Sequence, residues 1–428
     1  MTDLRSDPCS STAEPFVLDV TGTDTAGEAA RLRALGPLVR VDVDGVQATA
    51  VTEYEAARRV FTHPMVSKDA HQHWPDFLND RVSPSWSLIV WVAVRNMFTA
   101  FGGDHQRLRR LVSPAFAPKR IEALGSRIDA IATELIAGLA SRPAGVVVDL
   151  REDYAAQLPL RVISELMGLP ADLQISLRIC VDRIFDTSPD PDCDPSVNLT
   201  ELEALLTEFV HRRRTELDSG SAAPGDDLTS FLISERDENG DRLTEQELIH
   251  TLLLLVAAGY ETTVNLIDNL ITRVLTDPGL LDRLHAGEFG WEEMIEETLR
   301  LEPPVPHLPM RYAVDDIDIA GHDIPQGEAI LVSIIAANRD SLRHGPTADK
   351  FDPTRSDQGH LAFGWGAHHC LGAPLARMEA RTAMSKLFDR FPGTTLAVPA
   401  AELQPLTSIV SLGHKALPVY LGIGSDEA

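Results

Sequence analysis

The feature that most restricts the fold of this chain is one long helix near its centre. Thr244-Glu245-Gln246-Glu247 has the form of a capping box, in which the first and last side chains satisfy backbone N–H groups at a helix start. Asp277-Pro278 ends the helix, because the residue before a proline disfavours helical backbone angles. A helix over residues 245–276 would reach roughly 48 Å, about the width of a domain. Its middle must therefore run through the protein interior.

Helical periodicity also dominates the rest of the chain, and only two regions have the alternating pattern of strands. Residues 39–51 alternate around Asp44-Gly45, which is typical of a hairpin with a two-residue turn, and residues 317–335 form the second β region. We therefore predict a mainly α fold with a small β region. Besides the central helix, apolar spacing predicts helices over residues 104–113, 118–140, 155–167, 198–217, 291–301 and 374–391.

The charge of the chain excludes some classes of partner. It has 64 Asp plus Glu against 38 Lys plus Arg, a formal net charge of −26, which repels nucleic acid and anionic lipid surfaces. The longest apolar run, residues 252–259, is far shorter than the roughly 20 residues that span a bilayer, and residues 1–15 lack a secretory signal. We expect a cytoplasmic protein without nucleic acid or membrane partners. Its scattered cysteines imply no disulfide framework: Cys9, Cys180, Cys193 and Cys370.

Cys370 lies near the end of a glycine-rich segment, Phe363-Gly364-Trp365-Gly366-Ala367-His368-His369-Cys370-Leu371-Gly372, and Pro374 suits the first turn of the helix that follows. A cysteine at such a helix start lies beside free backbone N–H groups and the positive end of the helix dipole, which favour the thiolate. The glycines permit close approach of a flat molecule such as a macrocycle. Taken alone, a cysteine before a helix is more often an inert, buried packing residue.

The spacing Phe363-x-x-Gly366-x-His368-x-Cys370-x-Gly372 resembles the haem-binding loop of the cytochrome P-450 superfamily. The resemblance implies a single large α-rich domain, which we place at residues 29–428 after an N-terminal arm at residues 1–28. It is nearest to soluble bacterial members of actinomycete type. Further motifs of the family follow in its order: His105-x-x-x-Arg109, Ala258-Gly259-Tyr260-Glu261-Thr262, Glu297-x-x-Arg300 and Asn338-Arg339-Asp340.

The resemblance implies haem b as the cofactor and Cys370 as the axial ligand of its iron. A thiolate ligand pushes electron density onto the iron and favours cleavage of the oxygen–oxygen bond. The two haem propionates require basic donors at one edge of the pocket. The residues expected to contact the haem or leave room for it are His105, Arg109, Gly259, Arg311, Phe363, Gly366, His368 and Gly372.

Glu261 and Thr262 follow an apolar run in the central helix, where an unpaired carboxylate would be costly. Alone, Glu261 could equally form a structural ion pair with a neighbouring helix. The resemblance implies that this acid and alcohol steer protons during oxygen activation, with Tyr260 at a position where many relatives carry histidine. It also implies that Glu297 and Arg300, one helical turn apart, form a pair that supports folding and the haem loop.

The substrate cavity is expected to be largely apolar, so we predict a hydrophobic small molecule of steroid, terpenoid or macrolide size. Residues 86–94 suit either a loop over the pocket or a packed helix. His307 could anchor the substrate or bind the backbone near Pro306. Besides Leu88 of this apolar segment, the residues expected on the cavity wall, placed there by the resemblance, are Leu254, Ala258, His307, Leu308, Ile409 and Val410.

We predict a monooxygenase that hydroxylates a C–H bond, using dioxygen and two electrons from NAD(P)H through ferredoxin reductase and ferredoxin. Two alternatives stay open: a peroxide-driven haem enzyme, and a catalytically silent scaffold for a partner enzyme. A basic surface near the cysteine could dock an acidic iron–sulfur protein by charge complementarity, or could be an ordinary solvated face. Its residues are Arg107, Arg110, Arg377 and Arg381.

Overall fold

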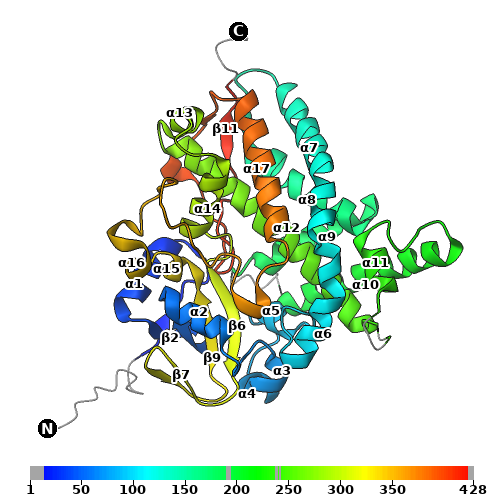
Figure 1. Cartoon of the computed structure of the whole chain (residues 1–428), viewed down its shortest axis with the longest axis vertical. Coiled ribbons are helices and arrows are strands. Elements are labelled where there is room, and N and C mark those ends of the chain that lie inside the picture. The colour runs from blue at the N-terminus through cyan, green and yellow to red at the C-terminus, as the bar shows by residue number, and fades with distance from the viewer. Residues whose placement is uncertain (1–13, 189–193, 237–239, 241, 423–428) are drawn as a thin grey trace.

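The computed structural model describes residues 14–188, 194–236, 240 and 242–422. Helices fill one side of the molecule, and a smaller part that contains β2, β6 and β9 with α1, α2 and α15 lies beside them (Figure 1). None of the helices in these ranges is long and apolar enough to cross a membrane. The predicted mainly α fold with a small β region is confirmed.

The seven predicted helices are confirmed, and their bounds differ from the predicted ones by three residues at most. They are α6 (Gly102–Val112), α7 (Pro118–Ala140), α8 (Gln157–Met167), α10 (Pro195–Ser219), α12 (Glu245–Thr276), α14 (Trp291–Leu301) and α17 (Ala373–Arg390). Helices that the periodicity did not indicate include α1 (Thr25–Leu35), α2 (Tyr54–Thr62), α5 (Ile89–Ala93), α9 (Ala171–Phe185), α11 (Leu228–Ser234), α13 (Leu280–His285), α15 (Ile334–Asn338) and α16 (Ser341–His344).

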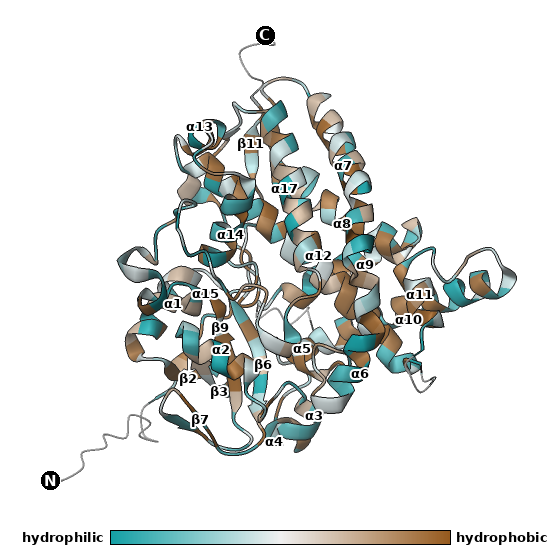
Figure 2. Ribbon diagram, in the orientation of Figure 1, coloured by the Kyte–Doolittle hydropathy of each residue, from teal (hydrophilic) through white to brown (hydrophobic). Residues whose placement is uncertain are grey.

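The central helix α12 starts and ends as predicted. The Glu247 N–H donates to Thr244 Oγ1 at 3.2 Å, and the Thr244 N–H donates to Glu247 Oε2 at 2.8 Å, which completes the capping box. The helix packs against α8, α9, α10, α14 and α17, so its middle is buried. Figure 2 shows hydrophobic residues concentrated around it.

The largest sheet has the strand order β1-β2-β3-β9-β6-β4. The predicted hairpin joins β2 to β3 through Asp44 and Gly45, whose positive φ angles of 55° and 82° fit a tight two-residue turn. The strands are β1 (Phe16–Val17), β2 (Leu38–Val43), β3 (Val46–Val51), β4 (Val66–Ser67), β6 (His307–Ala313) and β9 (Ala329–Ser333). Smaller sheets join β5 (Val147–Asp149), β10 (Thr395–Leu396) and β11 (Pro418–Tyr420), and pair β7 (Ile317–Ile319) with β8 (His322–Ile324).

The predicted N-terminal arm needs correction for its described part. Strand β1 pairs in parallel with β2, and α1 begins within the arm at Thr25, where the Asp24 side chain caps it. A two-residue strand and a helix that buries few large apolar side chains produce almost no apolar periodicity in the sequence. The sequence therefore did not predict β1 and α1. Residues 1–13 lie outside the described residues.

Candidate functional site

The segment before Cys370 forms a tight loop that leads into α17. The Cys370 N–H donates to the Phe363 carbonyl oxygen at 2.9 Å, which folds the loop back on itself. Gly364 and Gly366 have φ angles of 68° and 72°, a region that other residues rarely adopt. A Cβ atom at Gly366 would lie 3.0 Å from the carbonyl oxygen of Phe61, so Gly366 serves the loop conformation and packs against α2.

The electrostatics at Cys370 are more balanced than a helix start alone suggests. The surrounding protein atoms have the largest effect and raise the pKa of the thiol, although Cys370 is exposed toward the cavity that it lines, while the backbone N–H groups of Gly372 and Ala373 and the charges of Arg109 and Arg377 lower it. A coordinated metal ion deprotonates a thiol outright. A thiolate at Cys370, as expected from the sequence, would therefore require a bound metal ion in addition to the helix dipole.

Cys370 lines a cavity of about 230 Å³ whose opposite wall is α12. The cavity wall is mostly apolar, and Thr262 is one of its few hydroxyl groups. The predicted site residues found on this wall are Arg109, Leu254, Ala258, Gly259, Thr262, Leu308, Arg311, Phe363, His368, Cys370 and Gly372. The structure thus brings together residues that are as far apart in sequence as Arg109 and Gly372.

Four residues expected on the cavity wall lie elsewhere. Leu88, Ile409 and Val410 are at most 1% exposed and pack into the core. Leu88 precedes the short helix α5, so the middle of the 86–94 segment is a packed helix rather than a loop over the pocket. His307 faces Glu28 of α1, with Nε2 and Oε1 3.8 Å apart, because alternate residues of β6 point to opposite faces of the sheet. Burial lowers the pKa of His307 to about 4 and raises that of Glu28 to about 7.

Lys68, Arg109, Arg311 and His368 line this cavity, and His105 packs against His368 beside it; we call these five side chains the basic edge. The His105 and His368 rings lie 4.0 Å apart between centroids, and the other members of the set all lower the pKa of His368 together with burial. Among the described residues, no Asp or Glu forms an ion pair with any of the five, although Arg311 is 2% exposed.

The basic edge fits a ligand that carries carboxylates. Arg311 Nε and His105 Nε2 are buried and have no hydrogen-bond partner within the described residues. Burial lowers the pKa of Arg311 to about 9 and that of His105 to about 4. Buried cations are unfavourable unless an anion lies beside them. A ligand with negative groups would therefore stabilise the basic edge, and the two propionates of haem b would supply such groups.

Lys68 is the one residue of the basic edge that was not predicted from the sequence. A lysine is a surface residue by default, and no periodic pattern surrounds this one. The structure places it directly after β4, an edge strand that pairs with β6, where it is 2% exposed. Its burial follows from contacts between segments that are far apart in sequence.

Glu261 and Thr262 of α12 face two different cavities. Thr262 lines the cavity at Cys370, and its Oγ1 donates to the Ala258 carbonyl oxygen at 2.7 Å. Glu261 lines a separate polar cavity of about 450 Å³ that also contains Tyr260 and Asp182. The acid and the alcohol are therefore adjacent in sequence but line separate cavities.

Glu261 is 4% exposed and is held by three donors on a single oxygen. Its Oε1 accepts from Arg151 Nη2 at 3.0 Å, Asn265 Nδ2 at 3.0 Å and Ser411 Oγ at 3.3 Å. Burial raises the pKa of Glu261, and Arg151 opposes that shift. The ion pair with a neighbouring helix that was considered from the sequence exists, and its partner Arg151 begins the short π-helix (Arg151–Ala155) that precedes α8.

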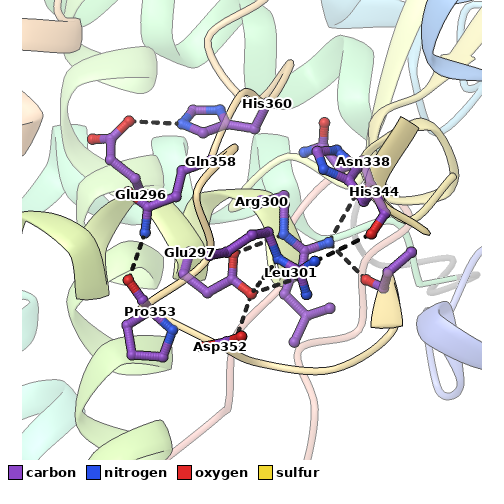
Figure 3. Close-up of polar contacts among 12 residues, drawn as sticks. Glu296, Glu297, Arg300, Leu301, Asn338, His344, Asp352, Pro353, Gln358 and His360 are labelled. Carbon is purple, nitrogen blue, oxygen red and sulfur yellow. Dashed lines mark hydrogen bonds and ion pairs between the residues drawn. The ribbon is translucent and has the colours of Figure 1, made fainter. Parts of the chain in front are cut away.

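Glu297 and Arg300 form a fully buried bidentate ion pair in α14, with both nitrogen–oxygen distances at 2.7 Å. Figure 3 shows that the pair also contacts the segment leading to the Cys370 loop. Arg300 donates to the carbonyl oxygens of Asn338, Ala348 and Lys350, and Glu297 accepts the Asp352 N–H. The pair thus ties α14 to the chain that precedes Phe363.

The predicted basic surface near Cys370 is interleaved with acidic residues. Among its arginines, Arg107 pairs with Glu247, Arg377 with Glu296, and Arg381 with Glu292. This surface is therefore a face of alternating charge rather than a continuous basic patch.

The chain is similar in sequence and in structure to known proteins over nearly its whole length. A family model described as cytochrome P-450 matches residues 175–287 and 291–410. The 2-hydroxy-5-methyl-1-naphthoate 7-hydroxylase of Streptomyces carzinostaticus is 40% identical over 408 residues, which cover 95% of this chain and 97% of that protein. Vitamin D(3) 25-hydroxylase of Pseudonocardia autotrophica is 36% identical, covering 92% and 93%. The solved structure of CYP154A1 from Streptomyces coelicolor A3(2) has 47% identity, a TM-score of 0.88, and coverage of 95% and 100%.

Proposed function

Because this chain belongs to the cytochrome P-450 superfamily and is therefore a haem b monooxygenase, we propose that it hydroxylates a C–H bond of a hydrophobic small molecule. The bound haem supplies the iron that activates dioxygen. The single observation that carries the proposal is the mostly apolar cavity with Cys370 on one wall and the Gly259–Thr262 turn of α12 on the other.

We assign the residues at this cavity and behind it to four tasks. Cys370 would ligate the iron, and the basic edge would hold the propionates through Arg109, Arg311 and the two histidines. Thr262 would donate a proton toward the distal side of the cavity, and Glu261 would pass protons to it from the polar space behind α12. Glu297 and Arg300 would keep the ligand loop in place. The contacts described above support each assignment.

The substrate class follows from the cavity wall and from the relatives. The names of two relatives refer to a naphthoate and to vitamin D(3), both ring systems with few polar groups. We propose a substrate of this hydrophobic kind, up to steroid, terpenoid or macrolide size, held mainly by apolar contacts.

We further propose that a ferredoxin delivers two electrons, which an NAD(P)H-dependent ferredoxin reductase supplies. Positive and negative side chains alternate around Arg107 and Arg377. A ferredoxin would therefore dock there by matching individual charges rather than by attraction to an overall positive surface. The Glu261–Thr262 pair argues against a peroxide-driven enzyme, which needs no proton delivery to dioxygen. The intact Cys370 loop argues against a silent scaffold, and the cytoplasmic location predicted from the sequence stays a prediction.

The test begins with the carbon-monoxide difference spectrum of the reduced, haem-loaded protein. The wild type should show the band of a thiolate-ligated haem, Cys370→Ala should lose it, and Cys180→Ala, which removes a buried cysteine of α9, should keep it. Turnover of ligands that shift the spin state should require a surrogate ferredoxin and reductase. If Cys370→Ala kept the band, or if peroxide alone supported faster turnover than the electron-transfer proteins, the proposal would be wrong.

A further inference from the structure

Asp268 of α12 is a fully buried carboxylate whose polar contacts all fall on one oxygen. Its Oδ2 accepts the backbone N–H of His414 at 2.7 Å and lies 3.1 Å from the His414 ring Nδ1. The same oxygen lies 3.3 Å from Arg151 Nη1, and Oδ1 is buried without a partner among the described residues. The negative charge of Asp268 is therefore balanced by Arg151 and, when its ring is protonated, by His414.

Arg151 is shared between Asp268 and Glu261. Its Nη2 donates to Glu261 Oε1 at 3.0 Å, while its Nη1 contacts Asp268 and donates to Asn265 Oδ1 at 2.8 Å. The side chains of Glu261 and Asp268 are 6% and 0% exposed, so two buried carboxylates face one guanidinium. An uncompensated charge in the interior is costly, and a protonated His414 would supply the missing positive charge.

The loop that carries His414 is fitted closely against α12. A Cβ atom at Gly413 would lie 2.5 Å from Asn265 Oδ1, so a larger residue there would push the loop away from the helix. Ser411 of the same loop donates to Glu261 Oε1 at 3.3 Å. Residues 411–414 therefore contact Glu261 directly, and they reach its second carboxylate neighbour through His414.

Other charged groups nearby are paired or exposed. Close to His414, Glu302 pairs with Arg273, so these two charges offset each other. At the polar cavity, Arg178 pairs with two carboxylates whose side chains are 44% and 50% exposed, where water screens them, and Lys415 is exposed as well. The charged side chains that line this cavity besides Glu261 and Arg151 are Asp149, Glu152, Arg178, Asp182, Asp186 and Lys415.

The proton affinities of His414 and Glu261 are linked through Arg151. Burial disfavours the protonated His414 ring, but the hydrogen bond to Asp268 and the charges of Asp268 and Glu302 outweigh burial and raise its pKa. Burial raises the pKa of Glu261, and Arg151 opposes that shift. If His414 loses its proton, Asp268 has Arg151 as its remaining counter-ion, so the guanidinium stabilises the Glu261 carboxylate less.

We propose that His414 is a positioning residue for Glu261, because its protonation determines how Arg151 is shared between Glu261 and Asp268. With a protonated His414, Arg151 stays with Glu261 and keeps that acid ionised. With a neutral His414, Glu261 binds its proton more tightly, which brings its acidity closer to the operating pH and makes it a better proton donor. This inference rests on the proposed function, because it concerns the role of Glu261 in proton delivery.

The first measurement is the pKa of the His414 ring, followed by NMR of haem-loaded protein labelled at the histidine ring carbons, in the diamagnetic ferrous carbon-monoxide form. The His414 signal is the one absent from His414→Gln. Linkage is reciprocal, so Glu261→Gln should weaken proton binding by His414 about fivefold or more, because Arg151 then pairs with Asp268 alone. The matched control is Asp182→Asn, which removes a carboxylate of the same cavity that pairs with Arg178, and it should have a much smaller effect.

The second measurement is product formed per NAD(P)H consumed, on either side of the His414 pKa found by NMR. Glutamine at position 414 keeps a donor for Asp268 but cannot take up a charge. Below that pKa, His414→Gln should form up to about fivefold more product per NAD(P)H than the wild type, because proton transfer changes by no more than the acidity does. The difference should shrink as the pH rises. His285→Gln, which removes an exposed histidine of α13, should match the wild type at every pH.

The inference is overturned if Glu261→Gln leaves the His414 pKa unchanged or shifts it no more than Asp182→Asn does. It is also overturned if His414→Gln lowers product per NAD(P)H equally at every pH, which is the result expected of a purely structural residue. If the His414 pKa responds but Glu261→Gln forms as much product per NAD(P)H as the wild type, the linkage is supported and only the proposed role of Glu261 fails. The two failures are therefore distinguishable.

Discussion

Replacing Glu297 with glutamine should remove a large part of the stability of this protein. Both members of the Glu297–Arg300 pair are fully buried, so the variant leaves a guanidinium charge in the interior without its counter-ion. Removing one partner of a buried ion pair costs about 3–5 kcal/mol, whereas whole proteins are stable by about 5–15 kcal/mol. The three carbonyl oxygens that Arg300 also contacts cannot replace the lost carboxylate charge.

A matched control lies on the same helix. Glu292 pairs with Arg381 at 3.2 Å, but both side chains are more than half exposed, at 64% and 53%. An exposed pair of this kind contributes about 0–1 kcal/mol, so Glu292→Gln should be nearly neutral. Both variants make the same chemical change, and they differ mainly in burial.

Urea unfolding of the haem-loaded variants measures the difference, followed by tryptophan fluorescence and by the haem absorption band. The midpoint for Glu297→Gln should fall without a change in the urea dependence of the free energy. The haem band should be lost at a lower urea concentration than in the control, because the pair supports the segment before Phe363. If the two variants unfolded within about 1 kcal/mol of each other, burial would not be the deciding factor.

Three further outcomes are expected. Gly259→Ala would place a methyl group 3.0 Å from Ile163 Cδ1, so it should cost about 1–3 kcal/mol in urea unfolding, and Ile163→Val should restore part of the loss. Burial raises the pKa of Glu379 to about 8 from 4.5, so this residue should lower wild-type stability by up to about 5 kcal/mol between about pH 5 and pH 8, and in urea unfolding Glu379→Gln should keep only the smaller fall that groups such as Glu28, with a pKa raised to about 7, still cause. Glu261→Gln should reduce product formed per NAD(P)H consumed by about a hundredfold, with Arg151 still paired to Asp268, and an unchanged ratio would exclude Glu261 from proton delivery.

The features that the sequence alone predicted correctly are set by neighbours in the chain. The capping box at Thr244, the hairpin turn at Asp44-Gly45 and the glycine-rich loop before Cys370 each use residues a few positions apart. Periodic apolar spacing likewise encodes the buried face of a long helix such as α12. Helix α1 and strand β1 escaped prediction because they are too short or bury too few large side chains to carry such a pattern.

Tertiary structure determines which residues line the cavity. His307 and Leu308 are adjacent in sequence, yet the alternation of side chains along β6 sends one toward Glu28 and the other into the cavity. Glu261 and Thr262 are also adjacent in sequence, and because successive side chains of α12 point in different directions around the helix axis, the two residues line different cavities. Lys68 is buried only because β4, β6 and Phe98 meet around it. Which side chain faces a cavity depends on packing between distant segments, and local sequence patterns do not encode that packing.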